Sequence, residues 1–452
     1  MSLSSTNEQT PLYERPADLL QRLIRFDTTN PPGNERECVE WIDGLLREGG
    51  YETATFAKDP ERPNLLARLK GRDQAPALLL YGHADVVPTE GQTWRHPPFE
   101  GKNVDGWVWG RGALDMKGGV AMMLAAFLRA KAEGLTPPGD VLFLVVSDEE
   151  SGGDYGAKFL VEEHARLFDG VRYAIGEFGG FTLYLGRRRF YPIQVAEKQL
   201  CFLRATVRGP GGHGALPLRG GAMAKLARLL GRLDRRRLPV HVTPAARRFF
   251  ETMADALPFP TGTILRGLLD PRLTDRTLAL LGDKGRAFDP MLHNTVNATI
   301  VRGGAKINVI PSEVTVEMDG RLLPGYTPTD MIAELRRLVG ADVEFEVIRH
   351  DPGPPEPDMG LFDTLAGILR EADPDGIPVP LLFPAITDAR FFSRLGIQTY
   401  GFLPMKLPKD FNFNQTVHAA DERIPAEALS FGADTIYEAL QRFGGDVLGS
   451  SG

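Results

Sequence analysis

The sequence predicts an α/β fold: a doubly wound, mostly parallel sheet with a smaller ferredoxin-like α+β domain inserted into it. Three observations support this prediction. Short apolar runs at 78–80, 141–146 and 171–175 are bounded by polar or Gly/Pro-rich sequence, as in strands buried on both faces of a parallel sheet. From about Lys198 the strands alternate apolar and polar residues, which is typical of a half-exposed antiparallel sheet. After a proline-rich segment at 351–357 the buried pattern resumes, so the first domain is split in sequence.

The individual elements follow from apolar spacing and from Gly and Pro positions. In the first part, helices are predicted at 19–24, 35–48 and 120–133, and strands at 64–69, 77–81, 141–146 and 171–175. In the second part, the order β-α-β-β-α-β is predicted by 200–208, 222–233, 297–302, 313–321, 329–339 and 343–349. A helix at 361–369 and a strand at 397–402 follow. The first domain is therefore assigned to 1–197 and 351–452, and the inserted domain to 198–350 with an extra helical insertion at 239–292.

The composition excludes several classes of partner. A chain of 452 residues with 42% hydrophobic and 25% charged residues is typical of a globular protein with two or three domains. Its formal net charge of −7 argues against a nucleic-acid or anionic-membrane partner, because both require a basic face. Two cysteines, Cys38 and Cys201, indicate a reducing compartment. We find no signal peptide and no apolar stretch that would span a bilayer, so a cytoplasmic location is expected.

Ionisable side chains follow three of the predicted buried strands. His83 and Asp85 end the first strand and, two residues apart, point to the same side. The segment 147–150 (SDEE) follows the second strand, and Glu177 follows the third. Each group alone is most simply a turn histidine or a solvated carboxylate. In open α/β sheets, however, ligands bind at the carboxyl ends of the strands, so the recurrence predicts one shared site.

The chemistry of these groups suits a pair of metal ions. The candidate ligands are His83, Asp115, Glu150, Glu177 and His418. Two divalent cations about 3.5–4 Å apart, sharing a bridging carboxylate, can polarise a carbonyl group and acidify a water molecule. Two imidazoles with three carboxylates suit zinc, with cobalt or manganese as alternatives. Glu149, next to Glu150, would then be free to act as a general base.

Several longer motifs carry a resemblance to a known family. The segments GHADVVP, W-x-x-PPF, DG-x-x-x-GRGALDMKGG, SDEE-x-G, GE and TVHAADERI resemble the co-catalytic dizinc amidohydrolases and exopeptidases. That family includes glutamate carboxypeptidase, acetylornithine deacetylase, succinyl-diaminopimelate desuccinylase, aminoacylase and the Gly-X carboxypeptidases. The motifs occur in the family's order along nearly the whole chain, apart from both tails and the 239–292 insertion. The resemblance implies a zinc-exopeptidase-like catalytic domain with an inserted lid and dimerisation domain.

The resemblance also implies a role for each matching position. Asp115 would bridge the two metals, with His83 and Glu177 at one metal and Glu150 and His418 at the other. Glu149 would be the general base, and Asp85 would support the metal-bound His83. The peptide bond after Asp115 is expected to be cis.

The inserted domain contributes a second group of candidates. The segment 209–214 (GPGGHG) satisfies the pattern G-x-G-x-x-G, but the alternating strand before it and Pro217 after it argue against a dinucleotide site. In the resembled family this motif supplies a histidine to a neighbouring subunit, so His213 implies a homodimer formed through the inserted domain. Asn308 and Arg321 match positions that hold a substrate carboxylate, a task that suits a guanidinium group.

Simpler interpretations of these positions remain open. Without the resemblance, His213 is a loop histidine and Arg321 forms a surface ion pair with Asp319. Gly401, near the last strand's end, would let the backbone approach a substrate or would simply form a turn.

Together these observations predict a metal-dependent hydrolase that cleaves an amide or peptide bond next to a free carboxylate. Its substrate would be a short peptide or an N-acyl amino acid. Exopeptidase, carboxypeptidase or dipeptidase activity is the first reading, and N-acyl-amino-acid deacylase activity is the alternative. A third hypothesis is a non-catalytic metal-binding scaffold on the same fold. The complete ligand set and Glu149 argue against it.

Overall fold

The structure, a computed structural model, describes residues 10–340 and 342–444. The chain divides into two compact units, each with its own core. The first unit comprises the chain up to Val195, Asp358–Pro380 and the chain from Thr387 onward; the second, here called the inserted unit, comprises Ala196–Pro357 and Leu381–Ile386. The short segment 381–386 groups with the inserted unit, and the Lys198 amide donates a hydrogen bond to the Phe383 carbonyl, 3.1 Å away.

The first unit is organised by a nine-stranded sheet with the strand order β1-β2-β6-β3-β7-β17-β9-β16, in which β8 also pairs with β9. Its strands are β1 (Thr53–Phe56), β2 (Asn64–Leu69), β3 (Ala77–His83), β6 (Val141–Val146), β7 (Val171–Gly176), β8 (Leu183–Leu185), β9 (Arg188–Glu197), β16 (Gly376–Phe383) and β17 (Gln398–Gly401). The central strands β6, β3, β7 and β17 are parallel, and antiparallel pairs flank them. The predicted α/β class with a large, mostly parallel sheet is confirmed.

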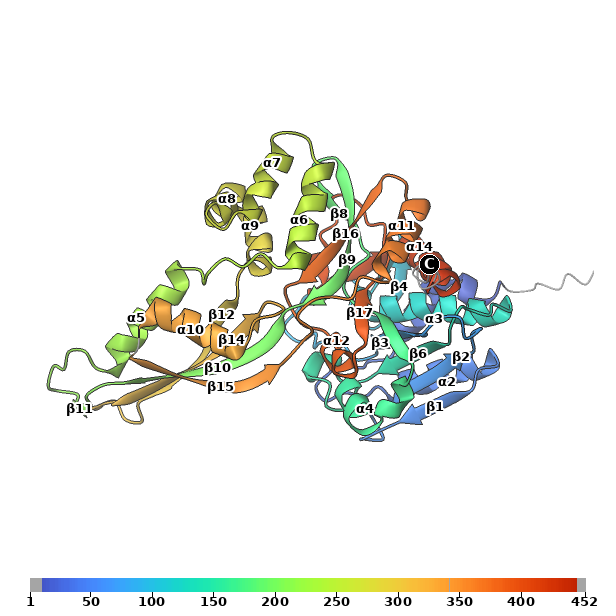
Figure 1. Ribbon diagram of the computed structural model, residues 1–452. Helices are drawn as coiled ribbons and strands as arrows, with labels where there is room; N and C mark the ends of the chain where they lie inside the picture. The colour runs from blue at the N-terminus through green and yellow to red at the C-terminus, as the bar shows by residue number, and fades with distance from the viewer. Residues whose placement is uncertain (1–9, 341, 445–452) are drawn as a thin grey trace, which may run out of the picture. The chain divides into compact units, whose positions relative to one another are not determined.

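Helices cover both faces of this parallel centre (Figure 1). On one face, Leu79 and Tyr81 of β3 pack with α4 (Ala157–Glu163) and α12 (Ala389–Phe392). On the other face lies α3 (Lys117–Ala132), which packs so closely that a Cβ atom at Gly82 would meet Met116, Val120 and Met123 at 2.8–3.1 Å. These contacts explain why β3 and β6 are apolar on both sides. The remaining helices of this unit are α1 (Pro16–Ile24), α2 (Arg36–Glu48), α11 (Phe362–Ala372), α13 (Phe413–Thr416) and α14 (Ala426–Arg442).

A small antiparallel sheet joins two distant parts of the chain in the first unit. It consists of β4 (Lys102–Val104), β5 (Trp107–Trp109) and β18 (Arg423–Pro425), in the order β18-β5-β4. Arg423 pairs with Trp109, which places the segment before β18 beside the segment after β5. Asp115 and His418 both belong to these adjoining segments.

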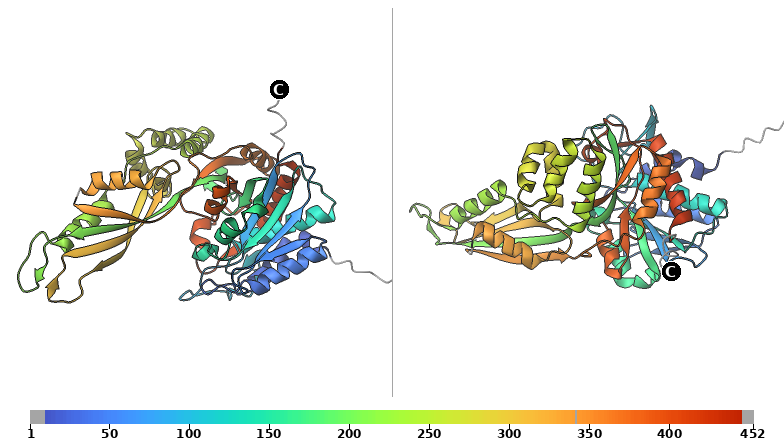
Figure 2. Two further views of the ribbon diagram at one scale, coloured as in Figure 1. Left: turned by 60° about the horizontal axis from the view of Figure 1, so that its bottom comes forward. Right: turned by 45° about the horizontal axis from the view of Figure 1, so that its top comes forward.

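The inserted unit has the predicted β-α-β-β-α-β order. Its four-stranded antiparallel sheet, ordered β12-β14-β10-β15, contains β10 (Gln199–Arg208), β12 (Thr295–Gly303), β14 (Glu313–Leu322) and β15 (Val343–Asp351). Figures 1 and 2 show α5 (Ala222–Arg235) and α10 (Pro328–Val339) on one face of this sheet. The apolar positions of β10 face these helices, as the alternating pattern predicts. A two-stranded ribbon, β11 (Gly212–His213) with β13 (Val309–Ile310), completes the unit.

The predicted helical insertion forms a cluster of four short helices. They are α6 (Pro244–Ala256), α7 (Thr261–Arg266), α8 (Thr274–Leu281) and α9 (Asp283–Phe288). Edge-to-face contacts among Phe249, Phe250 and Phe288 join α6 to α9. The helices among the described residues include none long and apolar enough to cross a bilayer.

Candidate metal centre

The strand register brings the three predicted strand ends to one edge of the sheet. His83 of β3 lies opposite Val146 of β6, and Leu80 lies opposite Ile175 of β7. The residues that follow these strands therefore converge, as predicted. Ligand atoms of His83, Glu149 and Glu177 lie within 4.8 Å of one another, and so do those of His83, Asp115 and Glu150.

Asp115 stands between two histidines. Its Oδ1 atom lies 3.1 Å from Nε2 of His83, and its Oδ2 atom lies 3.1 Å from Nε2 of His418. Glu177 Oε2 is 3.7 Å from the same atom of His83, and Glu150 Oε1 is 3.2 Å from that of His418. The five groups thus divide into two sets that share Asp115. The Asp115–Met116 peptide is cis, as the resemblance implies.

The electrostatics of this cluster indicate an excess of negative charge. Burial raises the pKa of Glu150 to about 7, against the lowering effect of its contact with His418. Burial also raises the pKa of Glu177, and desolvation together with the Glu177 charge raises that of Glu149. Hydrogen bonds to Asp115 and Glu150 raise the pKa of His418 to about 10. Carboxylates that resist ionisation without a counter-charge are typical of cation sites.

The donor set fits divalent metal ions. Oε1 of Glu177 is buried and, among the described residues, has no hydrogen-bond partner. Oε1 of Glu150 is also buried without a well-oriented hydrogen bond. Unsatisfied buried oxygens are costly unless a ligand satisfies them. Imidazole nitrogens with carboxylate oxygens are the donors that zinc, cobalt and manganese accept.

Asp85 contacts the ligand-bearing turn more closely than it contacts the histidine it was expected to support. Nδ1 of His83 lies 2.9 Å from the backbone carbonyl of Asp85, and 3.5 Å from its carboxylate. That carboxylate instead accepts hydrogen bonds from the amides of Glu149 and Glu150, both at 3.1 Å. Asp85 therefore joins β3 to the turn that carries the candidate base.

A buried ion pair that sequence reasoning missed holds Asp115 and His418. Nη1 of Arg111 lies 2.5 Å from Oε2 of Glu422, and neither side chain is exposed. Oε1 of Glu422 accepts the amides of Leu114 and Asp115, while Arg111 donates to the His418 carbonyl at 3.1 Å. The sequence carried a weak signal, because the motifs that contain Asp115 and His418 also contain charged residues with no assigned role, and Arg111 and Glu422 are among them.

A second missed residue is Asp388, which precedes α12. Both of its carboxylate oxygens are buried and, within the described chain, accept no hydrogen bond. Burial raises its pKa to about 7, with a further contribution from the charge of Glu177. The segment Thr387-Asp388-Ala389-Arg390 follows a strand that itself contains prolines, so no strand-end pattern marked it.

The remaining predicted residues belong mostly to the inserted unit. His213 and Asn308 are exposed and lie close together, because β11 pairs with β13 and the Gly214 amide donates to the Asn308 carbonyl. Arg321 makes the simpler contact foreseen for it, a two-bond ion pair with Asp319 at 2.6 and 3.0 Å. Its Nη1 atom is buried and has no hydrogen-bond partner in the described chain.

Packing accounts for Gly401 at the end of β17. A Cβ atom there would lie 1.8 Å from the carbonyl oxygen of Phe178 and 2.5 Å from that of Glu177. The absence of a side chain therefore lets β17 approach the segment that carries Glu177. Gly401 shapes the centre through this contact.

A parallel sheet that gathers imidazole and carboxylate groups at its strand ends, with an inserted ferredoxin-like unit, defines a metal-dependent hydrolase acting on C–N bonds. Comparison with known proteins supports the same class. The model of peptidase family M20/M25/M40 matches residues 79–442. The chain belongs to this family.

Individual relatives share the sequence over most of its length. The succinyl-diaminopimelate desuccinylase of Methylobacterium radiotolerans is 30% identical over 390 residues, which cover 82% of this chain and 85% of that protein. The N-fatty-acyl-amino acid synthase/hydrolase PM20D1 of Homo sapiens is 29% identical over 397 residues, covering 83% and 76%. The M20 family metallo-carboxypeptidase Sso-CP2 from Sulfolobus solfataricus shares the fold, with a TM-score of 0.67, 16% identity and coverage of 94% and 98%.

Proposed function

We propose that this protein cleaves an amide or peptide bond next to a free carboxylate, using two divalent metal ions, most consistent with zinc. The observation that carries the proposal is the position of Asp115, with one oxygen 3.1 Å from His83 and the other 3.1 Å from His418. A carboxylate in this position can bridge two cations. His83 and Glu177 would then complete one metal site, and Glu150 and His418 the other.

The catalytic role falls to Glu149. Its side chain converges with those of His83 and Glu177, and its amide is fixed by Asp85. When bound, the two cations would polarise the scissile carbonyl and lower the pKa of water. Glu149 would take the proton from the attacking water and deliver it to the leaving nitrogen. Asp85 would hold this base in position through the turn that it anchors.

Two versions of the substrate remain: a short peptide cleaved by an exopeptidase, and an N-acyl amino acid cleaved by a deacylase. A small cavity of about 10 Å³ adjoins Asp115 and Glu177, and every other side chain that lines it is apolar, including Phe178, Phe181 and Phe413. A cavity of this volume holds about one water molecule, so its lining does not separate the two versions. The relatives named for acyl-amino acids keep the deacylase version as the second candidate.

The inserted unit would supply the groups that bind the substrate carboxylate. Nη1 of Arg321 has no hydrogen-bond partner in the described chain, so the guanidinium retains a donor for a carboxylate oxygen. His213 and Asn308 lie together on an exposed loop pair, where they can act in a neighbouring subunit. Apolar side chains are exposed on the same unit, at Ile300, Val301, Ile307 and Val309. Exposed apolar side chains of this kind are compatible with a homodimer formed through the inserted unit.

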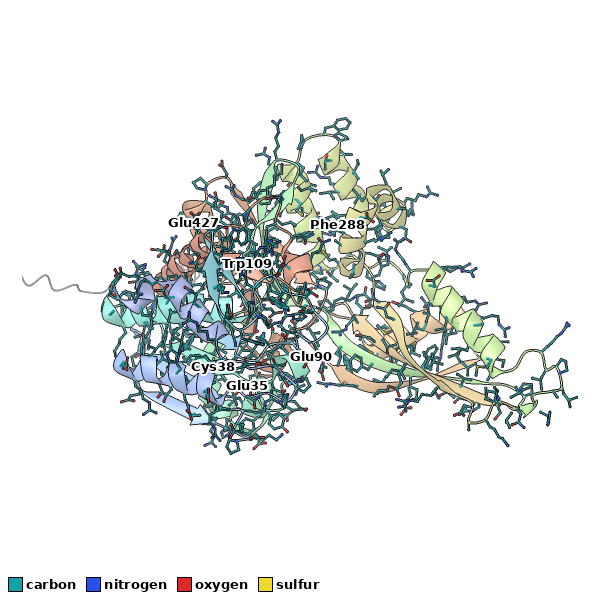
Figure 3. All side chains as sticks on the ribbon, turned by 180° about the vertical axis from the view of Figure 1, so that it is seen from behind. Glu35, Cys38, Glu90, Trp109, Phe288 and Glu427 are labelled. Atoms are coloured by element: carbon teal, nitrogen blue, oxygen red, sulfur yellow. The ribbon has the colours of Figure 1, made fainter. Side chains whose placement is uncertain are left out.

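The test is a hydrolysis screen of dipeptides and of N-acetyl, N-succinyl and long-chain N-acyl amino acids, with and without a chelator. Glu149→Gln should lower kcat by about 10²–10⁴-fold while zinc content and folding stay unchanged. Glu427→Gln, at the exposed start of α14, is the matched control and should keep full activity (Figure 3). Unchanged turnover in Glu149→Gln would contradict the mechanism, and no hydrolysis of any substrate would favour the scaffold reading.

The dimer is tested separately by light scattering after size-exclusion chromatography. Ile307→Asp and Val301→Glu should convert a dimer of the wild-type chain into monomers, because a charge would be buried in the interface. A monomeric wild-type chain would contradict this part of the proposal.

A further inference from the structure

Arg62 is a buried guanidinium that contacts none of the candidate metal ligands. It lies two residues before β2 and is 6% exposed. Its Nε and Nη2 atoms donate to the two carboxylate oxygens of Glu35, at 3.1 and 2.7 Å. Its Nη1 atom lies 2.9 Å from Oδ1 of Asp148. Glu35 precedes the first residue of α2, where Figure 3 labels it, so Arg62 ties this helix to the turn after β6.

From Asp148 a chain of hydrogen bonds leads to the candidate centre. Nδ2 of Asn30 donates both to Oδ1 of Asp148, at 3.0 Å, and to Oδ2 of Asp85, at 2.8 Å. Asp85 in turn accepts the amides of Glu149 and Glu150. The Arg62 side chain is therefore linked to the backbone of the base and of one metal ligand through three buried side chains.

These hydrogen bonds hold the turn at Asp148, whose backbone conformation is unfavourable for most residues. Asp148 has φ of +70°, in the left-handed region that residues other than glycine rarely occupy. Its Oδ2 atom accepts the Tyr155 amide at 3.1 Å, so both oxygens of the carboxylate are used to fix the turn. The Arg62 guanidinium is the cationic partner of that carboxylate.

Gly33 provides an independent sign that the place of Arg62 is built into the fold. A Cβ atom at Gly33 would lie 2.4–2.5 Å from Cζ, Nε and Nη2 of Arg62. No side chain can stand at this position while the guanidinium keeps its bonds to Glu35. Gly33 also has φ of +83°, so a suitable control must have the same backbone conformation.

We propose that Arg62 is a positioning residue, which holds the Asp148–Glu150 turn through Asp148, Asn30 and Asp85 and so fixes Glu149 relative to the metal ligand Glu150. This inference rests on the proposed function. It assigns Arg62 no contact with substrate or metal. Its effect should therefore fall on the chemical step and on metal affinity, with little effect on substrate binding.

The first experiment compares Arg62→Met and Arg62→Lys with the wild-type enzyme. A displacement of the base by about 1 Å costs on the order of 10²-fold in rate, so kcat should fall by about that factor while KM changes little. Zinc affinity, measured by competition with a chromophoric chelator, should fall by about 10–100-fold, as it does when residues that orient metal ligands are replaced. Millimolar methylguanidinium should restore part of the kcat of Arg62→Met, because it can refill the space left between Glu35 and Asp148.

The second experiment leaves Arg62 in the chain and displaces it. Gly33→Ala should reproduce the fall in kcat and in zinc affinity, without rescue by methylguanidinium. Gly170→Ala is the matched control, since Gly170 has φ of +80° and no atom within 4 Å of its Cβ position, and it should leave both quantities unchanged. If Arg62→Met does not fold, Gly33→Ala and Arg62→Lys decide the question.

The outcomes separate this inference from the proposed function. If the wild-type enzyme hydrolyses a substrate but folded Arg62→Met or Gly33→Ala keeps its kcat and zinc affinity, the positioning role is wrong. A rise in KM with unchanged kcat would also overturn it, because that result places Arg62 in substrate binding. If the wild-type enzyme hydrolyses none of the substrates, the proposed function fails; the positioning role is then judged on zinc affinity alone.

Discussion

The Arg111–Glu422 pair permits a quantitative prediction. Both side chains are fully buried, and removal of one partner from a buried pair costs about 3–5 kcal/mol, because the other charge stays behind. In Arg111→Met, Glu422 keeps the amides of Leu114 and Asp115 as donors, so we expect the lower end, about 3 kcal/mol. In Glu422→Gln, the guanidinium keeps carbonyl and amide acceptors, and a similar cost of about 3 kcal/mol is expected. The double variant removes both charges, so its cost should be smaller than the sum by at least about 2 kcal/mol.

Tryptophan fluorescence during urea unfolding is a suitable assay, because all four tryptophans lie in the first unit, at positions 41, 94, 107 and 109. The unfolding free energy of this unit is thus read without a signal from the inserted unit. Because Arg111 also bonds to the His418 carbonyl, each single variant should bind zinc more weakly than the wild-type protein. Single variants that each cost less than about 1 kcal/mol, or whose costs add in the double variant, would refute the assigned role of the pair.

Three further predictions concern pH, packing and metal. Burial, assisted by the charge of Arg321, lowers the pKa of Lys198 from 10.5 to about 7, so the unfolded chain binds more protons between these values. Stability should therefore rise with pH across this window, by up to about 4–5 kcal/mol, and urea unfolding followed by circular dichroism should show no such rise in Lys198→Met. Gly401→Ala should cost about 1–3 kcal/mol and weaken zinc binding, whereas Gly367→Ala, where a Cβ atom meets nothing within 4 Å, should do neither. Chelator treatment should lower the Tm, and two equivalents of zinc should restore it; saturation at one equivalent would contradict a two-metal centre. At a free zinc concentration 100 times Kd, zinc binding should raise the free energy of unfolding by about 2.7 kcal/mol per site.

The parallel centre of the fold could be predicted because burial on both faces leaves a continuous apolar run. The predicted strand at 141–146 agrees with β6 residue for residue, and that at 64–69 agrees with β2. By contrast, β9 and β16 gave no signal, since prolines and charges interrupt their sequences and local patterns did not mark them as strands. Pairing with strands that are distant in sequence holds these two segments in the sheet, and a single sequence does not reveal such pairing.

The candidate metal ligands could be predicted for a similar reason. The residues that hold these ligands in position could not be predicted. Residues that follow buried strands are marked by the strands themselves, which is why His83, Glu150 and Glu177 stood out. Arg62, Asn30 and Asp388 occur in loops whose sequence is ordinary. Their importance comes from burial, which only the folded chain reveals.

Arg62 and Arg111, two of the buried arginines, explain how an acidic centre can be held together without being neutralised. Arg62 bonds to Glu35 and Asp148, and Arg111 bonds to Glu422, to the Gln92 amide oxygen and to the backbone carbonyl of His418; in the described chain neither is paired with a side-chain ligand atom of the candidate set. A guanidinium group paired directly with Asp115 would compete with the cations for the same oxygens. A guanidinium group that bonds to neighbouring residues instead fixes the segments that carry the ligands. It leaves the ligand oxygens without a guanidinium partner. Oε1 of Glu177, which has no hydrogen-bond partner among the described residues, and Oε1 of Glu150, whose contact with His418 is poorly oriented for a hydrogen bond, are atoms that a divalent cation can bind.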